Sequence, residues 1–185
     1  MTASLPLTIV SGYLGAGKTT LINRLLAEDH GIRLMVIVND FGAINIDKAL
    51  IKTRGDDTIA LTNGCVCCTM GTDLTMALND VLDRHDRPDH LIIEASGIAD
   101  PAAIASAAIA EPELSYAGII TLVDAQNIEG LLDDPLIAPQ ATQQISAADL
   151  VLLTKTDTAA SALLDRLATM RARSPAVLDD TPLAP

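Results

Sequence analysis

The stretch Ser11–Thr20, "SGYLGAGKTT", decides the fold of this chain. It follows an apolar run at Leu5–Val10 and opens a segment, Thr19–Ala27, whose apolar residues have helical spacing. From Gly12 to Thr19 it matches the pattern G-x-x-x-x-G-K-[ST]. In this pattern the glycines let backbone N–H groups turn inward around phosphate oxygens, and the following helix N-terminus adds a favourable dipole. The sequence therefore predicts a phosphate-binding loop between a strand and a helix; the alternative is a glycine-rich turn without a ligand.

Individual residues of this loop have distinct expected roles. Lys18 is expected to reach the β- and γ-phosphates, the Thr19 hydroxyl to ligate Mg²⁺, and Thr20 to lie near the α-phosphate. The other loop residues expected to contact the nucleotide are Gly12, Gly15, Ala16 and Gly17.

The rest of the chain alternates continuously apolar segments with helical patterns. This alternation predicts an α/β fold of the P-loop NTPase type, with a mostly parallel sheet and helices on both faces. Strands are expected at 5–10, 34–38, 58–61, 91–93, 117–123 and 150–153, with a last one starting at 176. Helices are expected at 19–27, 74–82, after Pro101, 137–147 and 160–172.

Composition excludes several classes of function. The 185 residues suit one domain, which we expect to be a single P-loop domain over 1–185. A formal net charge of −12 and the near absence of aromatic residues argue against a nucleic-acid interface. No apolar run is long enough to span a membrane, and the first ten residues lack a signal-peptide pattern. We expect a cytoplasmic protein without membrane or nucleic-acid partners.

The segment Leu150–Asp157, "LVLLTKTD", indicates which nucleotide binds. A strand delivers the tetrapeptide at its carboxyl end, where ligands bind in parallel sheets. The tetrapeptide resembles the [NT]-K-x-D element of GTPases, in which the carboxylate of Asp157 would accept hydrogen bonds from guanine N1 and N2. The stem of Lys155 would cover the ring. Adenine lacks that donor pair, so Asp157 would select guanine; the alternative is a helix cap at Asp157.

A carboxylate near the γ-phosphate is the third expected element. In "LIIEASG", Glu94 ends a strand and Gly97 follows three residues later. Glu94 is expected to hold Mg²⁺ through water or to orient the attacking water, while the Gly97 N–H senses the γ-phosphate. Asp124, in "ITLVDA", is the second candidate carboxylate, and its role is left open between a supporting group and a helix cap.

All three cysteines lie in "LTNGCVCCTM", from Leu61 to Met70, which we interpret as a loop. Thiolates bind Zn²⁺ well, and Co²⁺ also fits a sulfur-rich site. Three ligands leave a fourth position open, which suits a carrier that exchanges its metal. A redox pair or buried structural thiols are the alternatives, and a disulfide between adjacent residues would be strained. The expected metal ligands are Cys65, Cys67 and Cys68, whereas the histidines His30, His85 and His90 are interpreted as solvated.

Together these motifs resemble the CobW-type P-loop GTPases, in the wider CobW/HypB/UreG-like group of metallochaperones. The resemblance adds "NDFGAINID" at Asn39–Asp47 and "EASGIADP" at Glu94–Pro101 to the motifs above. It implies a GTPase that binds zinc or cobalt through its cysteines and delivers the metal to a client metalloprotein or a cobalamin-type pathway. Nucleotide state would gate metal release. The catalytic set it implies is Lys18, Glu94, Gly97 and, in the first switch, Asp40.

The chain departs from the family pattern at two positions. Val38 and Ala43 stand where many members carry glutamate, so the expectation of a metal site rests mainly on the cysteines. The smaller C-terminal domain common in the family is not expected within these residues. Hydrolysis is expected to be slow, since no arginine finger is evident near the phosphate motifs. The competing hypotheses are a P-loop ATPase or small-molecule kinase, and a nucleotide-gated binding module without turnover; a homodimer is an assembly to test.

Overall fold

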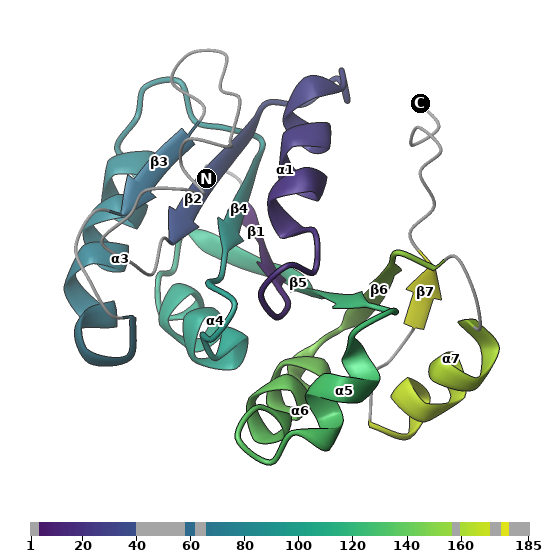
Figure 1. Cartoon of the computed structure of the whole chain (residues 1–185). Coiled ribbons are helices and arrows are strands. Elements are labelled where there is room, and N and C mark those ends of the chain that lie inside the picture. The colour runs from purple at the N-terminus through teal and green to yellow at the C-terminus, as the bar shows by residue number, and fades with distance from the viewer. Residues whose placement is uncertain (1–3, 40–57, 62–65, 157–159, 171–174, 178–185) are drawn as a thin grey trace.

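A seven-stranded sheet with every neighbouring pair parallel forms the centre of the molecule (Figure 1). The computed structural model describes residues 4–39, 58–61, 66–156, 160–170 and 175–177. Within them the strand order is β3-β2-β4-β1-β5-β6-β7. The strands are β1 (Leu5–Ser11), β2 (Leu34–Asn39), β3 (Thr58–Leu61), β4 (His90–Glu94), β5 (Leu114–Asp124), β6 (Leu150–Thr154) and β7 (Pro175–Val177).

Helices connect the strands and cover both faces of the sheet, which confirms the predicted fold class (Figure 1). On one face α1 packs against β1 and β2, and on the other face lie α3 and α4. The helices are α1 (Lys18–Ala27), α3 (Val66–Leu82), α4 (Pro101–Ile109), α5 (Ile128–Asp133), α6 (Ala138–Ala147) and α7 (Ala160–Thr169). No helix of the described residues is long and apolar enough to cross a membrane.

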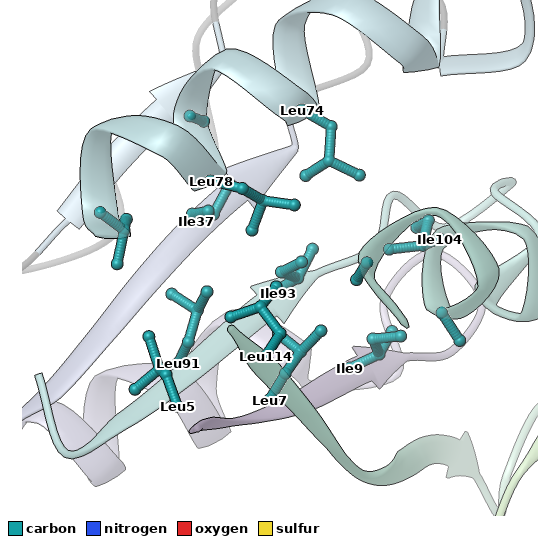
Figure 2. Close-up of a cluster of buried hydrophobic side chains, with 14 of the residues drawn as sticks. Leu5, Leu7, Ile9, Ile37, Leu74, Leu78, Leu91, Ile93, Ile104 and Leu114 are labelled. Carbon is teal, nitrogen blue, oxygen red and sulfur yellow. The ribbon is translucent and has the colours of Figure 1, made fainter. Parts of the chain in front are cut away.

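Alternation along the buried strands divides the core between the two faces. In β1, Ile9 belongs to the cluster under α3 and α4, whereas its neighbour Val10 packs on the α1 side with Ile22. Figure 2 shows the first cluster, in which side chains of β1, β2 and β4 meet Leu78 of α3 and Ile104 of α4. A third cluster, including Val151 and Leu167, joins β5 and β6 to α5, α6 and α7. The continuously apolar strands are therefore buried on both faces, as the sequence predicts.

The structure differs from the expected elements in three places. Helix α5 was not predicted, and β5 begins at Leu114 rather than at 117 because it continues through a bulge, with Gly118 at φ +146°. The interpretation of the cysteine segment as a loop is wrong in part, because α3 begins at Val66. The backbones of Cys67 and Cys68 therefore lie in the first turn of that helix.

Candidate functional site

The phosphate loop takes its shape from glycines in the left-handed region. Gly12, Gly15 and Gly17 have φ values of +138°, +78° and +95°, which L side chains rarely adopt. Gly12 also passes so close to β5 that a Cβ there would lie 2.4 Å from the backbone oxygen of Leu122. Gly17 is the N-cap of α1, so the loop leads directly into the helix N-terminus. The sequence motif therefore folds as a narrow backbone turn that places a helix N-terminus at the carboxyl ends of the strands.

Lys18, the first residue of α1, is buried beneath this turn, with 8% of its surface exposed. Its Nζ donates to the backbone oxygen of Gly12 at 2.8 Å and to that of Tyr13 at 3.4 Å. The ammonium group thus lies inside the curve of the loop and contacts its carbonyls. With a nucleotide bound, a phosphate group would take the place of these carbonyls as the partner of Lys18. This position fits the expected role of Lys18 at the β- and γ-phosphates.

Thr19 and Glu94 are brought together from α1 and the end of β4. The Thr19 hydroxyl donates to Glu94 Oε1 at 3.3 Å, and Glu94 is 3% exposed. Hydroxyl and carboxylate oxygens are the hard ligands that Mg²⁺ prefers, bound directly or through water. The residues present therefore fit a magnesium ion beside the loop. Thr20, next along α1, is exposed.

The end of β6 is tied directly to the phosphate loop. Thr154 Oγ1 donates to the backbone oxygen of Ala16 at 3.0 Å, and Lys155 Nζ donates to that of Gly15 at 3.0 Å. Lys155 has φ +55°, a conformation that is uncommon for a residue with a side chain and that recurs at functional sites. The "TKTD" segment thus begins beside the phosphate loop, although 138 residues separate Thr154 from Ala16.

Asp124 supports this arrangement from the end of β5. Its Oδ2 accepts from Lys155 Nζ at 2.6 Å and from Asn127 Nδ2 at 2.7 Å, and its Oδ1 accepts from the Gln126 N–H at 3.0 Å. Burial alone would raise the pKa of the Asp124 carboxyl, but these hydrogen bonds and the Lys155 charge hold that pKa below its usual value. The interpretation as a helix cap is wrong, because the N-cap of α5 is Asn127. The structure instead shows a carboxylate that fixes Lys155.

Gly97 lies against the phosphate loop. A Cβ on it would lie 2.9 Å from the Leu14 backbone nitrogen and 2.8 Å from Leu14 Cγ, so only glycine fits. The segment from Gly97 to Asp100 is held on its other side by glutamines of α6, which the sequence analysis did not single out. The available signal was Gln144, a polar residue in the buried stripe of α6 with Ala141 and Ile145.

Several predicted site residues cannot be placed with these. Asp40, Asp157 and Cys65 lie outside the described residues, and for Cys67 and Cys68 only the backbone is described. Among the side chains that the structure does describe, no three His, Cys, Asp or Glu are grouped as a metal site. The interpretation of all three histidines as solvated is wrong for His30 and His90, which are partly buried. His30 Nε2 lies 2.9 Å from the Leu25 carbonyl oxygen, and Nε2 of His90, at the start of β4, lies 2.8 Å from the Thr8 hydroxyl of β1. Val38 is buried in the core on the α1 side.

Comparison with known proteins agrees with this geometry. Residues 6–179 match the family model described as "CobW/HypB/UreG, nucleotide-binding domain". The chain belongs to the CobW/HypB/UreG family. This membership accounts for the order of the phosphate loop, the Glu-x-x-Gly segment and "TKTD" along one parallel sheet.

Similar proteins include two curated relatives named as zinc chaperones. The zinc chaperone YjiA of Escherichia coli is 41% identical over 178 residues, which cover 91% of this chain and 55% of YjiA. The zinc chaperone CobW of a Sinorhizobium species is 34% identical over 207 residues, which cover 95% of this chain and 58% of that protein. This CobW/HypB/UreG-family chain thus spans little more than half the length of these relatives.

Solved structures show the same fold. The Zn(II)-bound YjiA GTPase from E. coli aligns with a TM-score of 0.68 and 33% identity, covering 98% of this chain and 58% of that one. HypB from Helicobacter pylori, solved in complex with nickel, aligns with a TM-score of 0.69. At 19% identity over 94% of this chain and 77% of its own, HypB supports the fold alone.

Proposed function

We propose that this chain binds and slowly hydrolyses GTP and couples its nucleotide state to the binding of zinc. One observation carries the nucleotide part: Thr154 and Lys155 donate hydrogen bonds to carbonyls of the phosphate loop. These bonds support the proposal, because they tie the first two residues of the segment proposed to select guanine to the phosphate loop, within reach of a single nucleotide. Asp157, two residues after Lys155, accepts the guanine N1 and N2 hydrogens in this proposal.

In the proposed hydrolysis, residues of the loop and of β4 divide the work. Lys18 leaves the loop carbonyls and neutralises the β- and γ-phosphates, while backbone N–H groups from Gly12 to Thr20 surround the phosphate oxygens. Thr19 and Glu94 would supply oxygens for Mg²⁺, and the ion would balance the charge developing on the phosphates. Asp40 and the Gly97 N–H respond to the γ-phosphate from the two switch segments.

Zinc is the proposed cargo, held by Cys65, Cys67 and Cys68 with one position open for exchange. The named function of YjiA and CobW supports this choice, as does the Zn(II)-bound YjiA structure. Cobalt is the alternative cargo. A client metalloprotein or a cobalamin-type pathway would receive the metal, and a homodimer is the assembly to test.

The nucleotide part is tested by competition. Purified chain with Mg²⁺ is titrated with a fluorescent GDP, which is then displaced by GTP or by ATP. We expect GTP to displace it at concentrations at least about 100-fold lower than ATP, because the amide-like donor pair of guanine is absent from adenine. Asp157→Asn should remove that preference, and Asp165→Asn, at an exposed position of α7, should keep it. Preference for ATP would refute the proposal, and GTP binding without phosphate release would reduce it to a binding module.

The metal part is tested by zinc titration of the reduced protein. One zinc ion per chain is expected, and Cys67→Ser should weaken its binding at least about tenfold, because one of three thiolates is lost. His85→Gln, at an exposed position, serves as the control for adventitious binding by histidine. Unchanged zinc binding by Cys67→Ser would refute the ligand assignment.

A further inference from the structure

Helix α6 holds every residue of the segment from Gly97 to Asp100. Gln140 Nε2 donates to the Ile98 carbonyl at 2.6 Å, and Gln143 Nε2 donates to Asp100 Oδ2 at 2.8 Å. Asp100 is in turn the N-cap of α4, where its Oδ1 accepts from the Ala102 N–H at 2.9 Å. The segment beside the phosphate loop is therefore attached to a helix more than 40 residues further along the chain.

Gln144 makes the buried part of this attachment. Its side chain is among the largest fully buried ones, and its Nε2 donates to the carbonyls of Gly97 at 3.0 Å and Ala99 at 3.1 Å. The Ala99 N–H closes the same turn by donating to the Ser96 carbonyl at 3.0 Å. One amide group thus uses both of its hydrogens to fix two carbonyls of a single tight turn. Buried carbonyls that lose their donor are costly, so this arrangement strongly favours one orientation of the turn.

The turn is fixed from the opposite side by the phosphate loop. Gly97 lies against Leu14, whose backbone nitrogen would be 2.9 Å from a Cβ on Gly97. The position of α6 is itself defined relative to the sheet, because Thr121 Oγ1 of β5 donates to the Gln144 carbonyl at 3.1 Å. The Gly97 peptide is therefore held between the phosphate loop and the Gln144 amide, with little freedom to reorient.

We propose that Gln144 is a positioning residue for recognition of the γ-phosphate. Its amide fixes the Gly97 and Ala99 carbonyls, and the Ala99 N–H in turn bonds the Ser96 carbonyl, which shares a peptide plane with the Gly97 N–H. The Gly97 N–H is thereby oriented to meet a nucleoside triphosphate without prior rearrangement of the turn. The inference rests on the proposed function, which assigns the γ-phosphate to Gly97. Gln143 is exposed and Gln140 is partly exposed, and the hydrogen bonds of both to the segment are open to solvent, where they compete with water. Gln144 therefore contributes most of the orientation.

The test compares a diphosphate with a triphosphate. Gln144→Met keeps the length of the side chain and removes both donors, and its affinity is measured for GDP and for the non-hydrolysable analogue GMPPNP in the presence of Mg²⁺. We expect GMPPNP affinity to fall about tenfold while GDP affinity stays within about twofold. Turnover of saturating GTP should fall as well.

Matched variants separate positioning from stability. Gln143→Met makes the same change on the next residue of α6, whose amide bonds a side chain and not the turn carbonyls, and should leave the GMPPNP-to-GDP ratio unchanged. Ile145→Val weakens the buried face of α6 without touching the turn and should lower the melting temperature with the same ratio. If Gln144→Met does not fold, Gln144→Asn, which retracts the amide by one methylene, should show the same selective loss.

Two results overturn the inference. Equal loss of affinity for both nucleotides, or an unchanged ratio in a folded variant, would mean that Gln144 only stabilises the fold. If wild-type protein prefers ATP, the proposed function fails, and the same comparison with ADP and AMPPNP tests Gln144 independently of guanine.

Discussion

The phosphate loop and the turn at residues 96–99 contact each other at Leu14 and Gly97, yet their shapes have different origins. The loop is shaped by its own three glycines, all of which have positive φ. The turn is shaped largely by Gln144, a residue of another helix that bonds two of its carbonyls. One element of the site is therefore encoded locally and the other by tertiary contacts. Substitutions can separate the two.

The largest effect is expected from Gly12→Ala, which disrupts the phosphate loop, the element whose shape is set by its own glycines. A Cβ at this position would lie 2.4 Å from the Leu122 backbone oxygen, and the φ of +138° is unfavourable for alanine. We expect nucleotide binding to be lost and the free energy of unfolding to fall by at least about 2 kcal/mol, since backbone must move to relieve the contact. Urea unfolding and GDP titration measure the two effects.

Gly31→Ala provides the matched control for that change. Gly31 also has positive φ, at +67°, but nothing lies within 4 Å of the added Cβ. It should cost only about 1 kcal/mol for the backbone conformation and leave GDP affinity unchanged. Equal effects of the two variants would show that the close approach to β5 is unimportant.

Gly97→Ala changes the turn at residues 96–99, whose shape depends on tertiary contacts. Its φ lies outside the left-handed region, so the clash with Leu14 is the main penalty. We expect GMPPNP affinity to fall about 10- to 100-fold relative to GDP, the range for losing a hydrogen bond to a charged group. Gly130→Ala, in α5 with open space around the added Cβ, should instead raise stability slightly. A Gly97→Ala variant with wild-type discrimination would remove Gly97 from the γ-phosphate site.

A smaller effect is expected where β6 meets the loop. Asp124→Asn removes the charge that pairs with Lys155 at 2.6 Å while keeping the shape of the side chain. Lys155 is 44% exposed, so solvent screens the pair, and we expect GTP affinity to fall by only about fivefold. Asp133→Asn, at an exposed position on α5 whose ion pair with Arg166 is 3.8 Å long, should have no effect. Similar GTP affinities for Asp124→Asn and wild type would show that Asp124 does not position Lys155.

The smallest effect is expected from His90, at the amino end of β4, whereas the phosphate loop lies at the carboxyl ends of the strands. Burial lowers the pKa of His90, so the unfolded chain binds a proton near pH 6.5 before the folded chain does. Stability from this residue is thus present above that pH and lost as pH falls through the lower pKa of the folded state. His90→Gln should flatten the stability profile between pH 7 and pH 5, whereas His85→Gln, at an exposed position, should not. Parallel profiles for wild type and His90→Gln would contradict this.

The same contrast explains what the sequence could predict. The phosphate loop, the alternating strands and helices, and the meeting of Thr19 with Glu94 follow from local patterns and from the rule that parallel strands end at one edge. The hydrogen bonds of Gln144 were not predicted, and the role of Asp124 was left open between a supporting group and a helix cap. Each depends on which helix or strand end lies beside another. The start of α3 at Val66 was missed because Asn63-Gly64 and the cysteines indicated a turn.

Control of metal binding by the nucleotide state can be measured directly as a difference in zinc affinity. Zinc affinity of the reduced chain is determined by competition with a chromophoric chelator, once with saturating Mg²⁺–GDP and once with Mg²⁺–GMPPNP. Two of the cysteines begin α3, the element that follows β3 and precedes the Glu94 strand. We expect zinc dissociation constants that differ by at least about fivefold between the two states, the lower range of coupling between sites. Equal constants would contradict it.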